Sequence, residues 1–224
     1  MNKGVSARKP ILTSHQIGIA AALGGLAFVW RALGLGIPLV PPFVIDLCHT
    51  ITLVAAFAGG PYVVIIVGIL IGIATVIPWT DMLGYSLCGV LFCLNVKGIY
   101  RLRGWKRHLL LWWWSAMHAY FIAPLYWLAM FDFVLHMIPF KVVLLWVWST
   151  GETTIYWLIR AIPLSILLEV APTFMEPRWS WRGGELPEPI KPGWTRYDTL
   201  GLLISIVVSA VSIIAIVTLL MILP

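Results

Sequence analysis

The residues best placed to do chemistry in this sequence are ionisable side chains that interrupt long apolar segments. Glu152 and Arg160 stand eight residues apart in one such segment, so on a helix they share a face about two turns apart. A carboxylate in an apolar segment has to be paired, protonated or in contact with a wet cavity. The pair therefore predicts either a structural polar network or a group that binds a ligand.

A second set of ionisable residues falls near the ends of apolar segments. Asp46 and His49 are three residues apart, on one helical face, just after a Pro-Pro pair at 41–42. The functional interpretation is a pocket where the ends of several helices meet on one side of a membrane. The alternative is that each side chain simply reaches headgroups and water. The full set is Arg31, Asp46, His49, Asp81, Asp132, His136 and Lys141.

Sequence motifs for catalysis or metal binding are absent. There is no Gly-rich phosphate loop, no HExxH and no nucleophile elbow. The three cysteines have no metal-ligand spacing and are predicted to be small buried residues. His108 and His118 are ten residues apart, so they form no helical metal pair, and His118 is expected to be hydrogen-bonded or to line a cavity. We expect no enzyme activity, no metal and no cofactor.

The composition places these residues in a membrane. Hydrophobic residues make up 61% of the 224-residue chain and charged residues only 11%, against roughly 25% charged residues in a soluble domain. Lipid cannot satisfy open backbone groups, so apolar runs of this length predict transmembrane helices. The stretch 97–107 has five basic residues and no acidic one. We therefore expect a multi-pass protein of the cell membrane with residues 97–107 and the N-terminus in the cytoplasm.

The predicted fold is an all-α transmembrane bundle. Proline and glycine clusters divide the chain into six core spans and one accessory span, which is rich in Ile, Val and Leu. The predicted divisions are a membrane core at 1–175, a cytoplasmic Pro/Trp-rich loop at 176–197 and the accessory helix at 198–224. The predicted spans are 16–35, 43–58, 62–77, 82–100, 108–131, 140–170 and 198–223, with Thr13 or Ser14 capping the first.

Small residues in the first span favour close contact with another helix. Ala20 and Gly24 form one small-xxx-small pair, and Ala21 and Gly25 form a second. The neighbour is either a partner protein or another span of this chain.

The runs at 43–46, 55–68 and 84–89 resemble the second to fourth helices of the substrate-binding S components of energy-coupling factor (ECF) transporters. The resemblance covers residues 16–170 and implies a six-helix binder of a vitamin-like micronutrient, with an outward pocket under the loop 34–42. It implies that Ala20 and Gly24 contact a transmembrane coupling subunit and that separate ATPase subunits supply the energy. The metal-binding members have a His at position two, where this chain has Asn2. The accessory span is not part of the family plan.

The predicted substrate site comprises seven ionisable residues from several spans. They are Arg31, Asp46, His49, Asp132, His136, Glu152 and Arg160.

Two other functions stay open. One is a non-catalytic subunit of a larger membrane complex, such as a respiratory assembly. The weaker one is a lipid-modifying enzyme that uses Glu152, Arg160 and His118.

Overall fold

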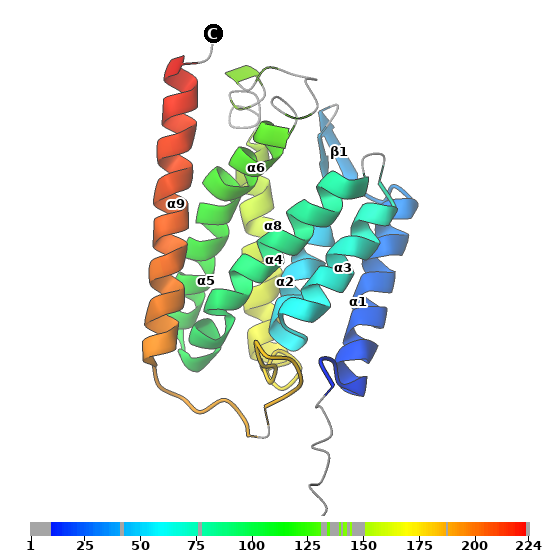
Figure 1. Ribbon diagram of the computed structural model, residues 1–224, viewed down its shortest axis with the longest axis vertical. Coiled ribbons are helices and arrows are strands. Elements are labelled where there is room, and N and C mark those ends of the chain that lie inside the picture. The colour runs from blue at the N-terminus through cyan, green and yellow to red at the C-terminus, as the bar shows by residue number, and fades with distance from the viewer. Residues whose placement is uncertain are drawn as a thin grey trace, which may run out of the picture.

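A computed structural model describes residues 10–40, 43–75, 78–130, 134, 139, 141, 142, 144, 151–186 and 188–222. The described chain forms a bundle of helices that run up and down roughly side by side (Figure 1). In chain order the helices are α1 (Ser14–Ala32), α2 (Cys48–Ala58), α3 (Pro61–Ile73), α4 (Pro78–Arg101), α5 (Trp105–Met117), the π-helix η1 (His118–Ile122), α6 (Ala123–Ala129), α8 (Glu152–Val170) and α9 (Arg196–Ile222).

The chain is a membrane protein. Helix α4, the stretch Thr153–Val170 of α8, and α9 are each long and apolar enough to cross a bilayer, while α2 and α3 are shorter apolar helices. Much of the molecular surface is apolar, as a lipid environment requires: Val207 and Ile214 on α9 are 59% and 64% exposed.

The predicted second span is wrong at its start. Residues Ile37–Val40 (β1) and Phe43–Ile45 (β2) form a two-stranded antiparallel hairpin, with Ile37 opposite Ile45. Proline disfavours helix in the residues before it, and Ile, Val and Phe favour extended structure. Helix α2 begins only after Asp46, whose Oδ1 accepts a hydrogen bond from the Cys48 backbone N–H at 2.8 Å.

The start of α1 confirms the predicted cap. The Thr13 side chain accepts a hydrogen bond from the Gln16 backbone N–H, and the Gln16 side chain accepts one from the Thr13 N–H. Gln16 is buried, and its Nε2 donates to the Gly59 carbonyl at 3.0 Å. This bond ties the first turn of α1 to the tight connection between α2 and α3.

Close helix contact is made by glycines on α3 rather than by a small-residue face turned outward. A Cβ built at Gly68 would meet Ser86 of α4, and one at Gly72 would meet Met82. Gly24 of α1 is also buried, and a Cβ there would meet Leu70 of α3. Small residues thus let α1, α3 and α4 approach one another within the bundle.

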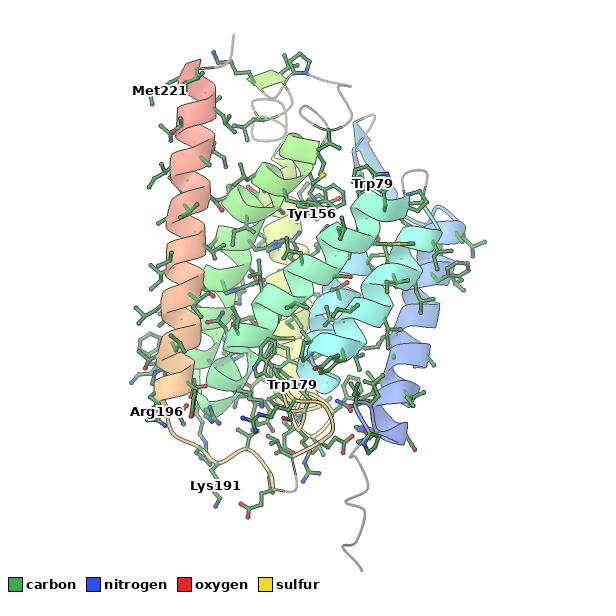
Figure 2. All side chains as sticks on the ribbon, viewed as in Figure 1. Trp79, Tyr156, Trp179, Lys191, Arg196 and Met221 are labelled. Carbon is green, nitrogen blue, oxygen red and sulfur yellow. The ribbon has the colours of Figure 1, made fainter. Side chains whose placement is uncertain are left out.

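The Pro/Trp-rich segment 171–195 folds back over one end of the bundle. The indole of Trp179 is buried, and its Nε1 donates to the Phe57 carbonyl at 3.0 Å. Gly60, with φ of 82°, lies against that ring and has no room for a side chain. Lys97 of α4 donates to the Trp179 carbonyl at 2.7 Å. Figure 2 shows Trp179 at the end of the molecule opposite Trp79.

Helix α9 stands at the side of the bundle and packs on α4 (Figure 1). Arg101 of α4 donates to the Asp198 carboxylate at 2.6 Å, and Asn95 donates to the Ser205 hydroxyl at 2.5 Å. These polar contacts fix the register of an otherwise apolar helix.

Candidate functional site

A π-helical turn places His118 in the centre of the molecule. The helix that starts at Trp105 continues through η1 into α6, and the Ala123 backbone N–H donates to the His118 carbonyl. Pro124 has no N–H to donate, which removes one regular helical hydrogen bond at this point. Such π turns are frequent at functional sites because they change the direction in which side chains point. His118 is 2% exposed.

The buried His118 contacts a buried arginine. Arg160 Nη1 lies 2.5 Å from His118 Nδ1. A guanidinium donates hydrogen bonds and accepts none, so Nδ1 is the acceptor and the neutral imidazole has its proton on Nε2. The opposite nitrogen of His118 is therefore a hydrogen-bond donor. The ring is held in place by Trp114, which stacks on it with centroids 5.2 Å apart.

Arg160 has no anionic partner among the described side chains. The residue is 1% exposed, and none of the described Asp or Glu carboxylates lies within ion-pair distance of it. Its guanidinium lies 5.6 Å from the centre of the Tyr156 ring, a cation–π contact. Its Nε finds no hydrogen-bond partner in the described part of the chain.

The inward face of α8 is polar in its first half. Thr153, Tyr156 and Arg160 recur at helical spacing on this face, and Leu164 and Leu168 continue it as apolar residues. The Thr153 hydroxyl is buried and has no partner within the described residues. The site therefore lies against the first two turns of α8, while the rest of this helix packs in the core.

His49 of α2 completes the cluster. Its ring lies between Tyr85 of α4, at 4.6 Å between centroids, and Tyr156 of α8, at 5.3 Å. His49 is 6% exposed, and its Nδ1 has no hydrogen-bond partner among the residues described. We call His49, His118, Thr153, Tyr156 and Arg160 the histidine–arginine cluster.

A small cavity lies beside this cluster. It has room for about one water molecule. Aromatic and apolar side chains form most of its wall, and His49, Cys88 and His118 add polar atoms. The lining residues are His49, Gly84, Leu87, Cys88, Leu91, His118, Ile122, Ala123, Tyr126 and Trp127.

A separate ionic network joins α1, the start of α2 and α4. Arg31 pairs with Asp46 and, at 3.1 Å, with Asp81. Asp46 is 2% exposed and accepts further hydrogen bonds from the Cys48 N–H and, at 3.2 Å, from the Tyr85 hydroxyl. Three of the predicted residues from distant parts of the sequence thus meet, with Tyr85 between this network and His49.

Six of the seven predicted substrate-binding residues fall into three groups. Arg31 and Asp46 lie in the ionic network, and His49 and Arg160 lie in the histidine–arginine cluster. Asp132 and His136 lie outside the described residues.

The role of Glu152 in substrate binding stays a prediction. Glu152 is the first residue of α8, because Gly151 adopts a left-handed conformation, with φ of 72°, directly before it. The predicted partner contact at Ala20 and Gly24 falls on the buried side of α1, and Gly24 faces Leu70 within the molecule.

The sequence-based site omitted the aromatic wall of the cavity and did not include His118. The spacing of His118, Ile122 and Tyr126 at four-residue intervals is a signal that one helical face lines a cavity. The contribution of Tyr156 has no comparable signal, because it depends on how α8 packs against α2.

Comparison with protein-family models, with curated proteins and with solved structures finds no match to this chain. Within the described residues, no three His, Cys, Asp or Glu side chains gather as a metal site. The cluster presents hydrogen-bond donors and a cation beside a largely apolar cavity.

Proposed function

We propose that this protein is a membrane-embedded subunit that captures a vitamin-like micronutrient from outside the cell. A transmembrane coupling subunit and separate ATPase subunits would then drive uptake, as the resemblance to ECF S components implies. The observation that supports capture is the cavity beside the histidine–arginine cluster, where buried polar atoms of His49, Thr153 and Arg160 have no partners among the described residues.

Unpartnered polar atoms at this depth are costly. Each buried donor or acceptor left without a hydrogen bond destabilises the fold by about 1–3 kcal/mol. Three of them in one cluster, of which His49 lines the cavity, are consistent with a site kept for binding, because a ligand would supply missing partners. Cavities with apolar walls and a few polar groups are also the usual form of small-molecule sites in helical bundles.

The arrangement of the two ends supports the proposed orientation. Arg31, Asp46 and Asp81 meet at one end of the bundle, close to the hairpin. The start of α1 and Lys97 lie at the other end, where both contact the segment 171–195. In the proposed topology the second end is cytoplasmic, in a multi-pass protein of the cell membrane, and α9 is an accessory span beside a six-span core.

Capture of a vitamin-sized molecule requires the cavity to open. The cavity holds about one water molecule, so its walls have to separate when a ligand enters. Leu87, Tyr126 and Trp127 are wall residues that are at least partly exposed, so this side of the wall can move without opening the buried core.

The test is capture from a complex mixture. The detergent-purified protein is incubated with yeast extract, which contains the water-soluble vitamins, and is then recovered by size exclusion. Small molecules released by denaturation are identified by mass spectrometry. We expect one compound to be enriched at a stoichiometry approaching one per protein. Recovery of no enriched compound would contradict the proposal.

The outward face of α9 favours a second function. This face is apolar and exposed along the helix, as at Leu203, Val207 and Val211, and it would suit a non-catalytic subunit of a larger membrane complex equally well. Copurification from native membranes separates the two proposals. ATPase subunits in the complex support capture for transport, whereas redox subunits support the second function.

A further inference from the structure

We propose that the captured molecule has an anionic group, and that this group docks against His118 with Arg160 directly behind it. The inference rests on the proposed capture function and deepens it by naming the chemical class of the ligand. It is carried by the geometry of the histidine–arginine cluster.

The histidine–arginine cluster has a buried positive charge. Arg160 is almost fully buried, and a guanidinium in a membrane interior is costly unless an anion neutralises it. The buried carboxylates of Asp46 and Asp81 are already bound by Arg31. Among the described residues, the cluster therefore has a cation and no anion.

The hydrogen-bonding groups that the cluster offers to a ligand are donors. Arg160 has donors only, and His118 accepts one of them at Nδ1, which leaves Nε2–H as the donor of a cavity-lining residue. The Tyr126 hydroxyl at the cavity wall already donates to the Thr80 carbonyl at 2.8 Å. A ligand group that meets the His118 Nε2–H must accept a hydrogen bond, and an anionic oxygen accepts the strongest ones.

The relation between His118 and Arg160 strengthens the preference. Because the guanidinium donates to Nδ1, its positive charge polarises the imidazole and makes the Nε2–H a stronger donor. A carboxylate or phosphate oxygen at Nε2 would form one end of a chain that runs from the anion through the imidazole to the guanidinium.

The apolar cavity wall indicates the chemistry of the rest of the ligand. Leu87, Leu91, Ile122 and Trp127 present apolar surface, and Trp127 also packs edge-on against Tyr126 with centroids 5.1 Å apart. Such a wall suits a flat or apolar body attached to the anionic group.

The test uses the capture assay with three variants. Wild type, Arg160→Gln and Arg160→Lys are each exposed to yeast extract, and Arg101→Gln is the matched control. Arg101 is a largely buried arginine at the end of the bundle covered by the segment 171–195, where it pairs with Asp198. All four proteins are checked for a single size-exclusion peak before capture.

The expected result is that wild type and Arg101→Gln enrich the same acidic compound. Arg160→Gln should lose it by at least tenfold, and Arg160→Lys should retain part of it because the positive charge remains. If Arg160→Gln does not fold, the mass-spectrometric identity of the compound bound to wild type still decides whether an anionic group is present.

Two results would overturn the inference and leave capture standing: a neutral or purely cationic compound bound to wild type, or an acidic compound retained in full by a folded Arg160→Gln. Recovery of no compound by wild type would instead contradict the capture function itself, and the inference with it.

Discussion

Two arginines in this protein, the partly exposed Arg31 and the buried Arg160, have opposite surroundings. Arg31 contacts two carboxylates, Asp46 and Asp81. The more buried one, Asp46, accepts hydrogen bonds from Arg31, the Cys48 N–H and the Tyr85 hydroxyl. Arg160 contacts a histidine and an aromatic ring, and in the described part of the chain it meets no carboxylate. The first arrangement is complete without a ligand, whereas the second lacks an anion. The comparison separates charge that holds helices together from charge that is available for binding.

Removing the charge of Asp46 should have the largest effect. Asp46→Asn leaves Arg31 with Asp81 alone and weakens the hydrogen bond to the Cys48 N–H at the start of α2. We expect a loss of about 1.5–3 kcal/mol in stability, the usual contribution of hydrogen bonds to a charged group, because Arg31 is partly exposed and keeps Asp81. The measurement is the thermal unfolding of the purified protein in detergent.

Glu188→Gln is the matched control for Asp46→Asn, because Glu188 pairs with Lys191 where both side chains are mostly exposed. Its melting temperature should equal that of wild type, since exposed ion pairs contribute little. Equal melting temperatures for Asp46→Asn and wild type would show that the ionic network does not hold the helices together.

Removing the charge of Arg160 should leave the stability of the ligand-free protein nearly unchanged or raise it. Arg160→Met deletes a buried cation that has no anion among the described residues, and it costs one hydrogen bond to His118. We expect the stability to stay within about 1 kcal/mol of wild type or to rise. Adding the captured ligand at a hundred times its Kd should stabilise wild type by about 2.7 kcal/mol and leave Arg160→Met unchanged.

Both parts of this prediction can be read from thermal unfolding with and without ligand. A loss as large as that of Asp46→Asn in the ligand-free protein would mean that Arg160 is a structural residue like Arg31, and the contrast between the two clusters would disappear.

Substitution of His118 in the histidine–arginine cluster should have a more limited effect, and one specific to ligand binding. Glutamine can accept a hydrogen bond from Arg160 and donate one to a ligand, whereas leucine can do neither. A hydrogen bond to a charged group contributes about 1.5–3 kcal/mol. His118→Leu should therefore weaken binding of the captured compound by that amount, and His118→Gln by clearly less. Equal Kd values for the two variants in isothermal titration would remove His118 from the binding site.

Much of the fold could be predicted from the sequence because hydrophobic length and proline or glycine breaks are local signals. The helix starting near Thr13 and the last helix, Arg196–Ile222, begin and end within a few residues of the expected positions. The hairpin Ile37–Val40 and Phe43–Ile45 was missed, because apolar residues without polar alternation suit a buried strand and a short helix equally.

The candidate site was only partly predictable, and the reason is that sequence spacing orders residues along one helix and not between helices. Asp46 and His49 are close in sequence, yet one joins Arg31 and the other joins Tyr156. Glu152 was chosen because it is a carboxylate in an apolar run, and the structure shows it as the first residue of α8, directly after Gly151. Trp179, in a segment expected to be a cytoplasmic loop, is buried against Gly60 because the segment folds back over the bundle.

The smallest expected effect on stability comes from Glu185, an exposed carboxylate that contacts Thr13 and His15. Glu185 accepts hydrogen bonds from Thr13 at 2.7 Å and from His15 at 3.0 Å, and these lower its pKa below the ordinary value of 4.5. A carboxyl whose pKa is lowered in the folded state stabilises the fold above its unfolded pKa. That contribution is lost as the pH falls through the folded pKa. Wild type should therefore melt slightly higher than Glu185→Gln at neutral pH, and this difference should vanish in acid below the folded pKa. A difference that persisted there would mean that the loss in Glu185→Gln comes from altered packing of the segment 171–195 and not from charge.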